Sequence, residues 1–184
     1  MKRILNLLSN IILICGLVFL ALKKAPSIIR QFETEGTHSP NFSISTLDGK
    51  LFDLRLQSSP LVIVFWTTWC GPCEVELARI NRMIRSNELD SQSVLAISLQ
   101  EEPTLVEKII KDRNYLFRIG LDSNGQVGNL FGIAGTPTII LLDKSQRIRW
   151  MTSGLSPTLE YHIGKLLRES SIYPSMPNFP SENH

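Results

Sequence analysis

The hydrophobic pattern of the chain opens with one long apolar stretch. Residues 4–22 are nearly all apolar and carry no charge, and basic residues stand on both sides of them. One helix needs roughly 20 such residues to cross a bilayer. The stretch is longer than the apolar part of a usual secretory signal, and no small-residue cleavage site follows it. We therefore predict a retained membrane anchor over residues 1–24, with a cleaved signal peptide as the alternative.

The pattern after the anchor separates a linker from a folded domain. Residues 25–40 are mixed and polar with no sustained apolar period, which is typical of a linker. Short apolar runs on either side of Asp48 and Gly49 predict a β-hairpin around that turn. Residues 61–66 form an unbroken β-branched and aromatic run, which indicates a strand buried on both faces of a sheet.

The rest of the domain alternates helical and strand patterns. Apolar residues at helical spacing predict helices, and short apolar runs bounded by turn residues predict strands. By these criteria the helices cover residues 73–85, 103–111 and 157–168, and the strands cover residues 93–99, 138–142 and 147–151. This alternation predicts an α/β fold with a mixed central sheet flanked by helices. The folded domain is expected over residues 41–169, and an irregular, proline-containing tail over residues 170–184.

Composition narrows the class of protein. With 184 residues, 43% of them hydrophobic, the chain can bury one full core but is short for two domains. The net charge of +2 arises from basic residues scattered among nearly as many acids, so nucleic acid is not expected as a partner. Three cysteines and three dispersed histidines supply neither a multi-disulfide scaffold nor the paired ligand clusters of structural zinc. We expect no metal and no cofactor.

The candidate chemistry lies in Cys70-Gly71-Pro72-Cys73, between the buried strand and the next helix. A thiolate attacks a disulfide, and a second cysteine within reach must then resolve the mixed disulfide. At a helix N-terminus, free backbone N–H groups and the helix dipole favour a thiolate at Cys70. Pro72 suits the first turn because its missing N–H has no partner to lose there. The motif therefore predicts Cys70 as the nucleophile and Cys73 as the resolving thiol.

Three segments in order resemble the thioredoxin superfamily, and within it the TlpA/ResA branch of extracytoplasmic thiol–disulfide oxidoreductases. The resemblance spans about residues 40–168 and rests on residues 42–54, 65–73 and 131–138. It implies a thioredoxin fold with a cis peptide between Thr136 and Pro137 that faces the cysteine pair. It also implies a substrate-docking surface around the two, formed by Trp69, Gly71, Pro72, Thr136 and Pro137. For Trp69 the alternative is simple packing.

Glu76 is a further candidate, because helical spacing places it with Cys73 and Leu77 on the apolar side of the helix. A carboxylate in a core-facing stripe requires a reason. The functional interpretation is an acid that takes or gives the proton of Cys73 during resolution. The position matches a glutamate of ResA-like proteins, whereas Val64 occupies the position of the buried aspartate of ordinary thioredoxin. The alternative is that Glu76 lies at the edge of the stripe and reaches solvent.

Other functions remain open at this point. A thiol peroxidase of the related peroxiredoxin group has Pro well before Thr-x-x-Cys; here Thr67 precedes Cys70, but Ile63 occupies the proline position. A membrane-tethered module that binds clients without turning them over is the non-enzymatic alternative. An oxidant or isomerase of the same fold is a third, because the direction of exchange depends on the redox potential of the pair.

Disulfides persist outside the cytoplasm, which favours the outer face of a bacterial cytoplasmic membrane for such a domain. Residues 4–22 would then lie in the lipid bilayer as a single pass. The resemblance implies reduction of disulfides in cysteine-containing exported proteins, including apocytochrome c before haem attachment. It also implies re-reduction by a membrane thiol-reducing electron donor related to the DsbD/CcdA type.

Overall fold

The computed structural model describes residues 35–172. The anchor predicted over residues 1–24, most of the predicted linker and residues 173–184 lie outside this range. Within residues 35–172, every helix is too short or too polar to cross a membrane.

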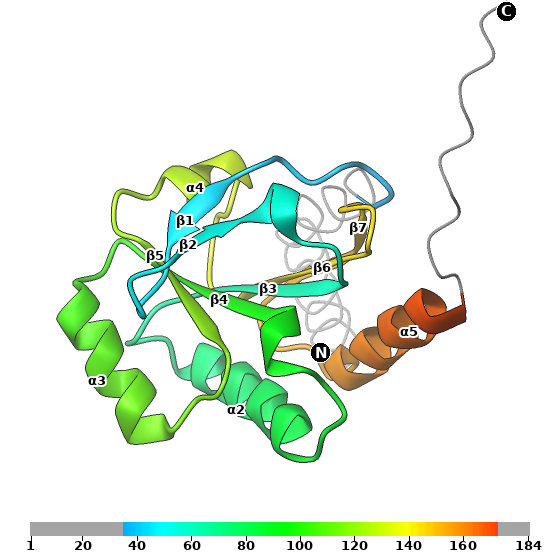
Figure 1. Ribbon diagram of the computed structural model, residues 1–184. Helices are drawn as coiled ribbons and strands as arrows, with labels where there is room; N and C mark the ends of the chain where they lie inside the picture. Colours follow the sequence, from blue (N-terminus) through cyan, green and yellow to red (C-terminus); the bar gives the residue numbers. More distant parts are fainter. Residues whose placement is uncertain (1–34, 173–184) are drawn as a thin grey trace, which may run out of the picture. The chain divides into compact units, whose positions relative to one another are not determined.

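A five-stranded mixed sheet forms the centre of the described part (Figure 1). Its strands stand in the order β5, β4, β3, β6, β7. They are β3 (Leu61–Trp66), β4 (Val94–Leu99), β5 (Arg118–Asp122), β6 (Thr138–Leu142) and β7 (Ile148–Ser153). Strands β3, β4 and β5 are parallel, while β6 runs antiparallel to both β3 and β7. The predicted mixed sheet is therefore confirmed.

Both faces of the sheet are covered, which explains the unbroken apolar run of β3. Helices α2 (Gly71–Arg85), α3 (Pro103–Arg113) and α5 (Leu159–Ile172) pack on one face, where Val62, Val64 and Trp66 point. Strands β1 (Ser43–Ser45) and β2 (Leu51–Asp53) and the short helix α4 (Gln126–Leu130) contribute to the core on the other face (Figure 1). Alternate β3 residues thus enter different cores. The central strand is fixed from both sides, and the motif follows at its end.

The hydrophobic pattern did not predict strand β5 or helix α4. Strand β5 contains Gly120, and a Cβ built there would lie 3.1 Å from Cδ1 of Ile44 in the hairpin. The missing side chain lets the hairpin approach β5, where Thr46 forms a β-bridge with Gly120. Helix α4 is only five residues long, and the buried Asp122 carboxylate accepts the backbone N–H groups of Val127 and Gly128. Helix α4 is thus started by hydrogen bonds to the Asp122 carboxylate and leaves no hydrophobic period in the sequence.

Ordered structure extends a few residues beyond the expected domain boundaries of residue 41 and residue 169. Residues 36–39 do not behave as a linker, because the N–H of Gly36 donates to Ile148 and that of Ser39 donates to Gln146. These contacts attach the segment beside β7. At the other end α5 continues to Ile172, into the segment expected to be irregular. Backbone pairing and helix propagation need no apolar period, so the sequence pattern did not show either extension.

Candidate active site

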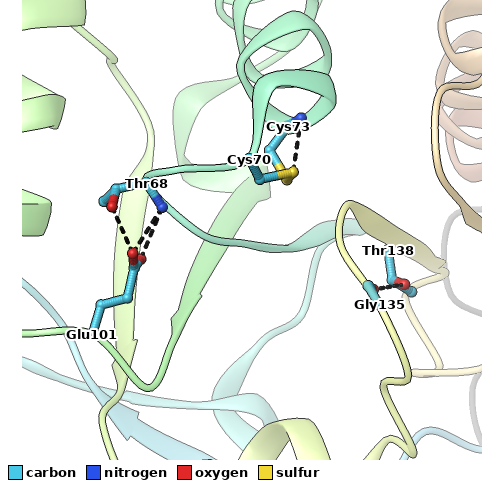
Figure 2. Close-up of a disulfide and its surroundings, with 6 residues drawn as sticks. All are labelled: Thr68, Cys70, Cys73, Glu101, Gly135 and Thr138. Atoms are coloured by element: carbon cyan, nitrogen blue, oxygen red, sulfur yellow. Dashed lines mark hydrogen bonds between the residues drawn. A yellow bond between two sulfur atoms is a disulfide. The ribbon is translucent and has the colours of Figure 1, made fainter.

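The cysteine pair lies where β3 gives way to α2 (Figure 2). Cys70 is the N-cap of α2, and its sulfur accepts a hydrogen bond from the backbone N–H of Cys73 at 3.2 Å. Pro72 occupies the first turn, as predicted. The two cysteines form a disulfide with their Cα atoms 5.2 Å apart. The described state is therefore the oxidised one, and the backbone already directs a donor at the Cys70 sulfur.

The two cysteines differ in access. Cys73 has no exposed surface, whereas Cys70 is 8% exposed and lines a groove with a volume of about 630 Å³. A thiol or disulfide from outside can therefore approach Cys70 along the groove, while Cys73 is covered by the core. This asymmetry agrees with the predicted order of attack.

The groove brings together four of the five residues that the resemblance assigned to substrate docking, all but the buried Pro137. The peptide between Thr136 and Pro137 is cis, as expected, and Gly135 and Thr136 line the groove opposite Gly71 and Pro72. Trp69 also lines it and is 79% exposed, so the simple-packing alternative for this residue is wrong.

Two hydrogen bonds hold the cis-proline loop from behind the groove. The hydroxyl of Thr138 donates to the Gly135 carbonyl at 2.7 Å (Figure 2). The N–H of Gly154, after β7, donates to the Pro137 carbonyl at 2.8 Å. The loop is thus fixed both within itself and to the end of the neighbouring strand.

Glu101, which the sequence pattern did not single out, holds the segment leading into the motif (Figure 2). Its carboxylate accepts the backbone N–H of Thr68 at 2.9 and 3.0 Å, the Thr68 hydroxyl at 2.6 Å and the Ser98 hydroxyl at 2.7 Å. The carboxyl ends of the parallel strands β3 and β4 meet at this edge of the sheet. The sequence signal available for Glu101 was its position just after β4. A residue there lies beside the segment that follows β3, because β3 and β4 are parallel neighbours.

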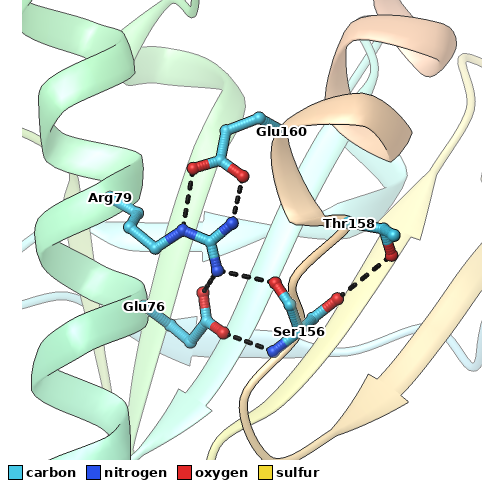
Figure 3. Close-up of polar contacts among 5 residues, drawn as sticks. All are labelled: Glu76, Arg79, Ser156, Thr158 and Glu160. Carbon is cyan, nitrogen blue, oxygen red and sulfur yellow. Dashed lines mark hydrogen bonds and ion pairs between the residues drawn. The ribbon is translucent and has the colours of Figure 1, made fainter.

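Glu76 is buried in the core-facing stripe of α2 and has no exposed surface, so the solvent-reaching alternative is wrong. Its Oε1 atom accepts the backbone N–H of Ser156 at 2.6 Å, and its Oε2 atom accepts Nη1 of Arg79 at 2.9 Å (Figure 3). The sequence analysis named neither partner. Arg79 stands three residues after Glu76, a spacing that places the two on one side of a helix, whereas Ser156 is distant in sequence and carried no signal.

Arg79 also pairs with Glu160 in the first turn of α5. The hydrogen bond to Glu160 is the main cause that raises the pKa of the Arg79 guanidinium. The same bond lowers the pKa of the Glu160 carboxyl below its ordinary value of 4.5. The pair therefore favours the charged form of both groups and ties α5 to α2.

A pH dependence of stability follows from the lowered pKa of Glu160. A depressed carboxyl pKa stabilises the fold above pH 4.5, the ordinary value, and this contribution is lost as the pH falls through the folded-state value. Glu160→Gln is expected to reduce the free energy of unfolding at neutral pH, because it removes the ion pair and a negative charge near the helix N-terminus. The free energies of unfolding of wild type and variant, measured with urea as a function of pH, should converge in acid. Curves that stay parallel would contradict this assignment.

The region around the motif also bears on the rival functions. Ile63, at the position of the peroxidase proline, lies inside β3 and pairs with Leu95 on one side and Ile140 on the other. A proline there would remove a ladder hydrogen bond from a central strand. Within residues 35–172, no group of three or more His, Cys, Asp or Glu side chains is arranged to hold a metal ion.

Comparison with known proteins gives consistent matches. The model of the AhpC/TSA family matches residues 36–151. The chain is 31% identical over 122 residues to the thiol-disulfide oxidoreductase ResA of Geobacillus thermodenitrificans, a match that covers 65% of this chain and 69% of that protein. It is 25% identical over 148 residues to ResA of Bacillus thuringiensis, covering 80% and 86% of the two chains.

Among solved structures, StoA from Bacillus subtilis matches with 25% identity and a TM-score of 0.59, covering 68% of this chain and 96% of that one. The described part thus has a thioredoxin-like α/β fold, and its cysteine pair occupies the strand-to-helix junction that the chemistry requires. The chain belongs to the AhpC/TSA family and, within it, to the ResA-type thiol–disulfide oxidoreductases, enzymes whose substrates are cysteine-containing proteins.

Proposed function

We propose that this protein is a membrane-anchored reductase that reduces disulfides of exported proteins on the outer face of a bacterial cytoplasmic membrane. Residues 4–22 would anchor it, and a membrane thiol-reducing donor would return the Cys70–Cys73 disulfide to the dithiol. Apocytochrome c before haem attachment is the proposed client. The observation that supports the proposal best is the groove, which gives access to Cys70 beside Thr136, the residue before the cis proline, while Cys73 stays covered.

In the first step the Cys70 thiolate attacks a client disulfide. A bond forms between the Cys70 sulfur and one client sulfur, and the other client sulfur leaves as a thiolate. The N–H of Cys73 and the N-terminus of α2 favour negative charge on Cys70 before the attack. The helix therefore supplies the stabilisation of the nucleophile.

In the second step Cys73 attacks the Cys70 sulfur. The Cys70–Cys73 disulfide forms, and the remaining client sulfur leaves with the electron pair, so that the client is reduced and the enzyme oxidised. Cys73 must lose its proton in a site without solvent, and Glu76 lies one turn further along the same side of α2. We assign to Glu76 the role of taking that proton and giving it back when the pair is reduced.

Client docking would involve Trp69, Gly71, Pro72 and Thr136, which line the groove with Cys70, together with Pro137. Trp69→Ala is expected to lower kcat/KM for a protein disulfide about tenfold, because an aromatic anchor in an interface is commonly worth more than 1 kcal/mol. The measurement is reduction of a protein substrate, compared with reaction of the same variant with a small chromogenic disulfide.

Tyr161→Ala provides the matched control for Trp69, because Tyr161 is also an exposed aromatic, at 62%, but does not line the groove. It should leave both rates unchanged. If Trp69→Ala lowered the rate of reaction with the small disulfide as much as the rate with the protein substrate, Trp69 would be acting on the motif and not on docking.

The redox potential of the Cys70–Cys73 pair tests the direction of exchange. A reductase is expected to have a potential near that of thioredoxin, about −270 mV, whereas the strong oxidant DsbA lies near −120 mV. Equilibration of the full-length protein with glutathione buffers of known ratio gives the value. A potential close to the oxidant would overturn the reductase proposal and leave the exchange chemistry intact.

A further inference from the structure

Arg79 joins three groups where α2 meets the start of α5 (Figure 3). Its Nε atom donates to Glu160 Oε1 at 2.7 Å, and Nη2 donates to Glu160 Oε2. Its Nη1 atom donates both to Glu76 Oε2, at 2.9 Å, and to the Ser156 carbonyl, at 2.6 Å. The planar guanidinium thus holds a side chain from each helix and the backbone between β7 and α5 at the same time.

The carboxylate of Glu76 depends on this arrangement. An ionised carboxylate without solvent contact is costly unless a cation and hydrogen-bond donors meet it. Ser156 supplies a backbone N–H, and within residues 35–172 Arg79 is the cation that forms an ion pair with Glu76. Removing Arg79 would therefore leave the Glu76 carboxylate without its ion-pair partner, with the Ser156 N–H still in place.

Arg79 also fixes where the carboxylate points. The Ser156 residue is held at both ends, since its N–H donates to Glu76 and its carbonyl accepts from Arg79. Two residues earlier, the N–H of Gly154 donates to the Pro137 carbonyl beside the groove. The carboxylate is thus bound to the chain segment that also holds the cis-proline loop, and its oxygens have little freedom to turn.

We propose that Arg79 is a positioning residue for the second step of exchange, acting through Glu76 and not on the sulfur atoms. It pairs with Glu76 and fixes its orientation so that the carboxylate can accept the Cys73 proton. This inference rests on the proposed role of Glu76. Glu160, on the other side of the guanidinium, holds Arg79 in place, and Arg82 acts on Glu160 from the next turn of α2.

The step assigned to this group is a proton transfer coupled to disulfide formation. The Cys73 S–H bond breaks, its proton passes to a Glu76 oxygen, and the Cys73 sulfur forms a bond with Cys70. The bond between Cys70 and the client sulfur breaks, and the client leaves as a thiolate. Arg79 would stabilise the carboxylate before the transfer and would not change the number of electrons exchanged.

The chromogenic disulfide dithiobis-nitrobenzoate isolates this step in the reduced full-length protein. Attack by Cys70 releases the first nitrothiobenzoate in a phase that depends on reagent concentration. Attack by Cys73 then releases the second in an intramolecular phase that does not. Stopped-flow traces across a range of pH give the midpoint at which the intramolecular phase becomes fast. A Cys15→Ala background leaves the pair as the reacting thiols.

Arg79→Gln is expected to move this midpoint upward by about one pH unit, because the carboxylate that accepts the Cys73 proton loses its ion-pair partner and one of its hydrogen bonds. Below the midpoint the intramolecular phase should be about tenfold slower than in wild type. Arg79→Lys keeps the charge but replaces a planar fork that makes four hydrogen bonds with a compact ammonium that has three donors, so it should move the midpoint by less. If Arg79→Gln is too unstable to study, the midpoint is measured with Arg79→Lys in its place.

Arg85→Gln is the matched control, because it removes the same charge from an exposed side chain in the last turn of α2 and should leave the midpoint unchanged. A double variant, Glu76→Gln with Arg79→Gln, should behave like Glu76→Gln alone. A merely structural Arg79 would instead slow the phase equally at every pH, and that result would overturn the inference, as would a double variant much slower than Glu76→Gln.

The same series separates the inference from the proposed role of Glu76. If Glu76→Gln leaves the intramolecular phase and its pH midpoint as in wild type, the role of Glu76 is wrong and the inference is wrong with it. If Glu76→Gln changes the midpoint and neither Arg79 variant does, Glu76 acts without Arg79, and the inference alone is overturned.

Discussion

A Cys73→Ser variant is expected to accumulate stable mixed disulfides with its clients, whereas Cys70→Ser should form almost none. Without Cys73 the bond between Cys70 and the client cannot be broken from within the enzyme, so the intermediate persists. Without Cys70 the remaining thiol has no exposed surface from which to attack. Both variants should lose catalytic turnover. Non-reducing gels of the full-length protein from cells, followed by mass spectrometry of the bands that disappear on reduction, give the measurement.

The double variant Cys70→Ser with Cys73→Ser is the control, in a Cys15→Ala background so that a mixed disulfide can be assigned to the motif. Clients retained reversibly by the double variant would indicate a binding module and contradict an enzyme. Exported cysteine-containing proteins among the trapped bands, apocytochrome c included, are expected for the proposed client class. Hydrogen-peroxide turnover by wild type would point to the peroxidase alternative.

Leu77→Ala is expected to lower the free energy of unfolding by about 3 kcal/mol, the usual cost of a cavity left by a fully buried leucine. Leu77 has no exposed surface and packs in the same core as Cys73, between α2 and the sheet. The change therefore leaves a void under the helix that carries the motif. Urea unfolding of the reduced protein measures the effect without a contribution from the disulfide.

Val75→Ala is the matched control on the same helix, because Val75 is 48% exposed. It should change the free energy of unfolding by less than about 0.5 kcal/mol. If the two variants were equally destabilised, helix propensity or a change in the unfolded chain would explain the effect, and the packing of α2 on the sheet would not.

Much of the fold was predictable because burial leaves a periodic signal. Strand β3 is covered on both faces, so its continuous apolar run could be assigned without the structure. The signal failed where something other than apolar packing decides the conformation. In β5, Gly120 has no side chain, and a Cβ there would contact Ile44 of the hairpin. In α4, Asp122 starts the helix through hydrogen bonds to two backbone N–H groups.

The residues of the site were also predictable from the sequence only in part. Cys70 and Cys73 were predictable because their chemistry depends on local spacing, and Glu76 because a carboxylate in an apolar stripe is conspicuous. Glu101 left only the signal of a polar residue just after β4, and Ser156 left none, since their contacts join segments more than 30 residues apart in the chain. Such contacts become visible only when strand order and helix packing are known.

The donor that meets the Cys70 sulfur belongs to the backbone of Cys73. A backbone N–H is present whatever side chain a residue carries, proline excepted. Mutation of surrounding side chains therefore cannot remove this contact, and drift elsewhere in the sequence should leave the nucleophile supported. Substitutions that adjust the reactivity of Cys70 are expected instead at Gly71 and Pro72. These two residues set how the first turn of α2 orients that N–H.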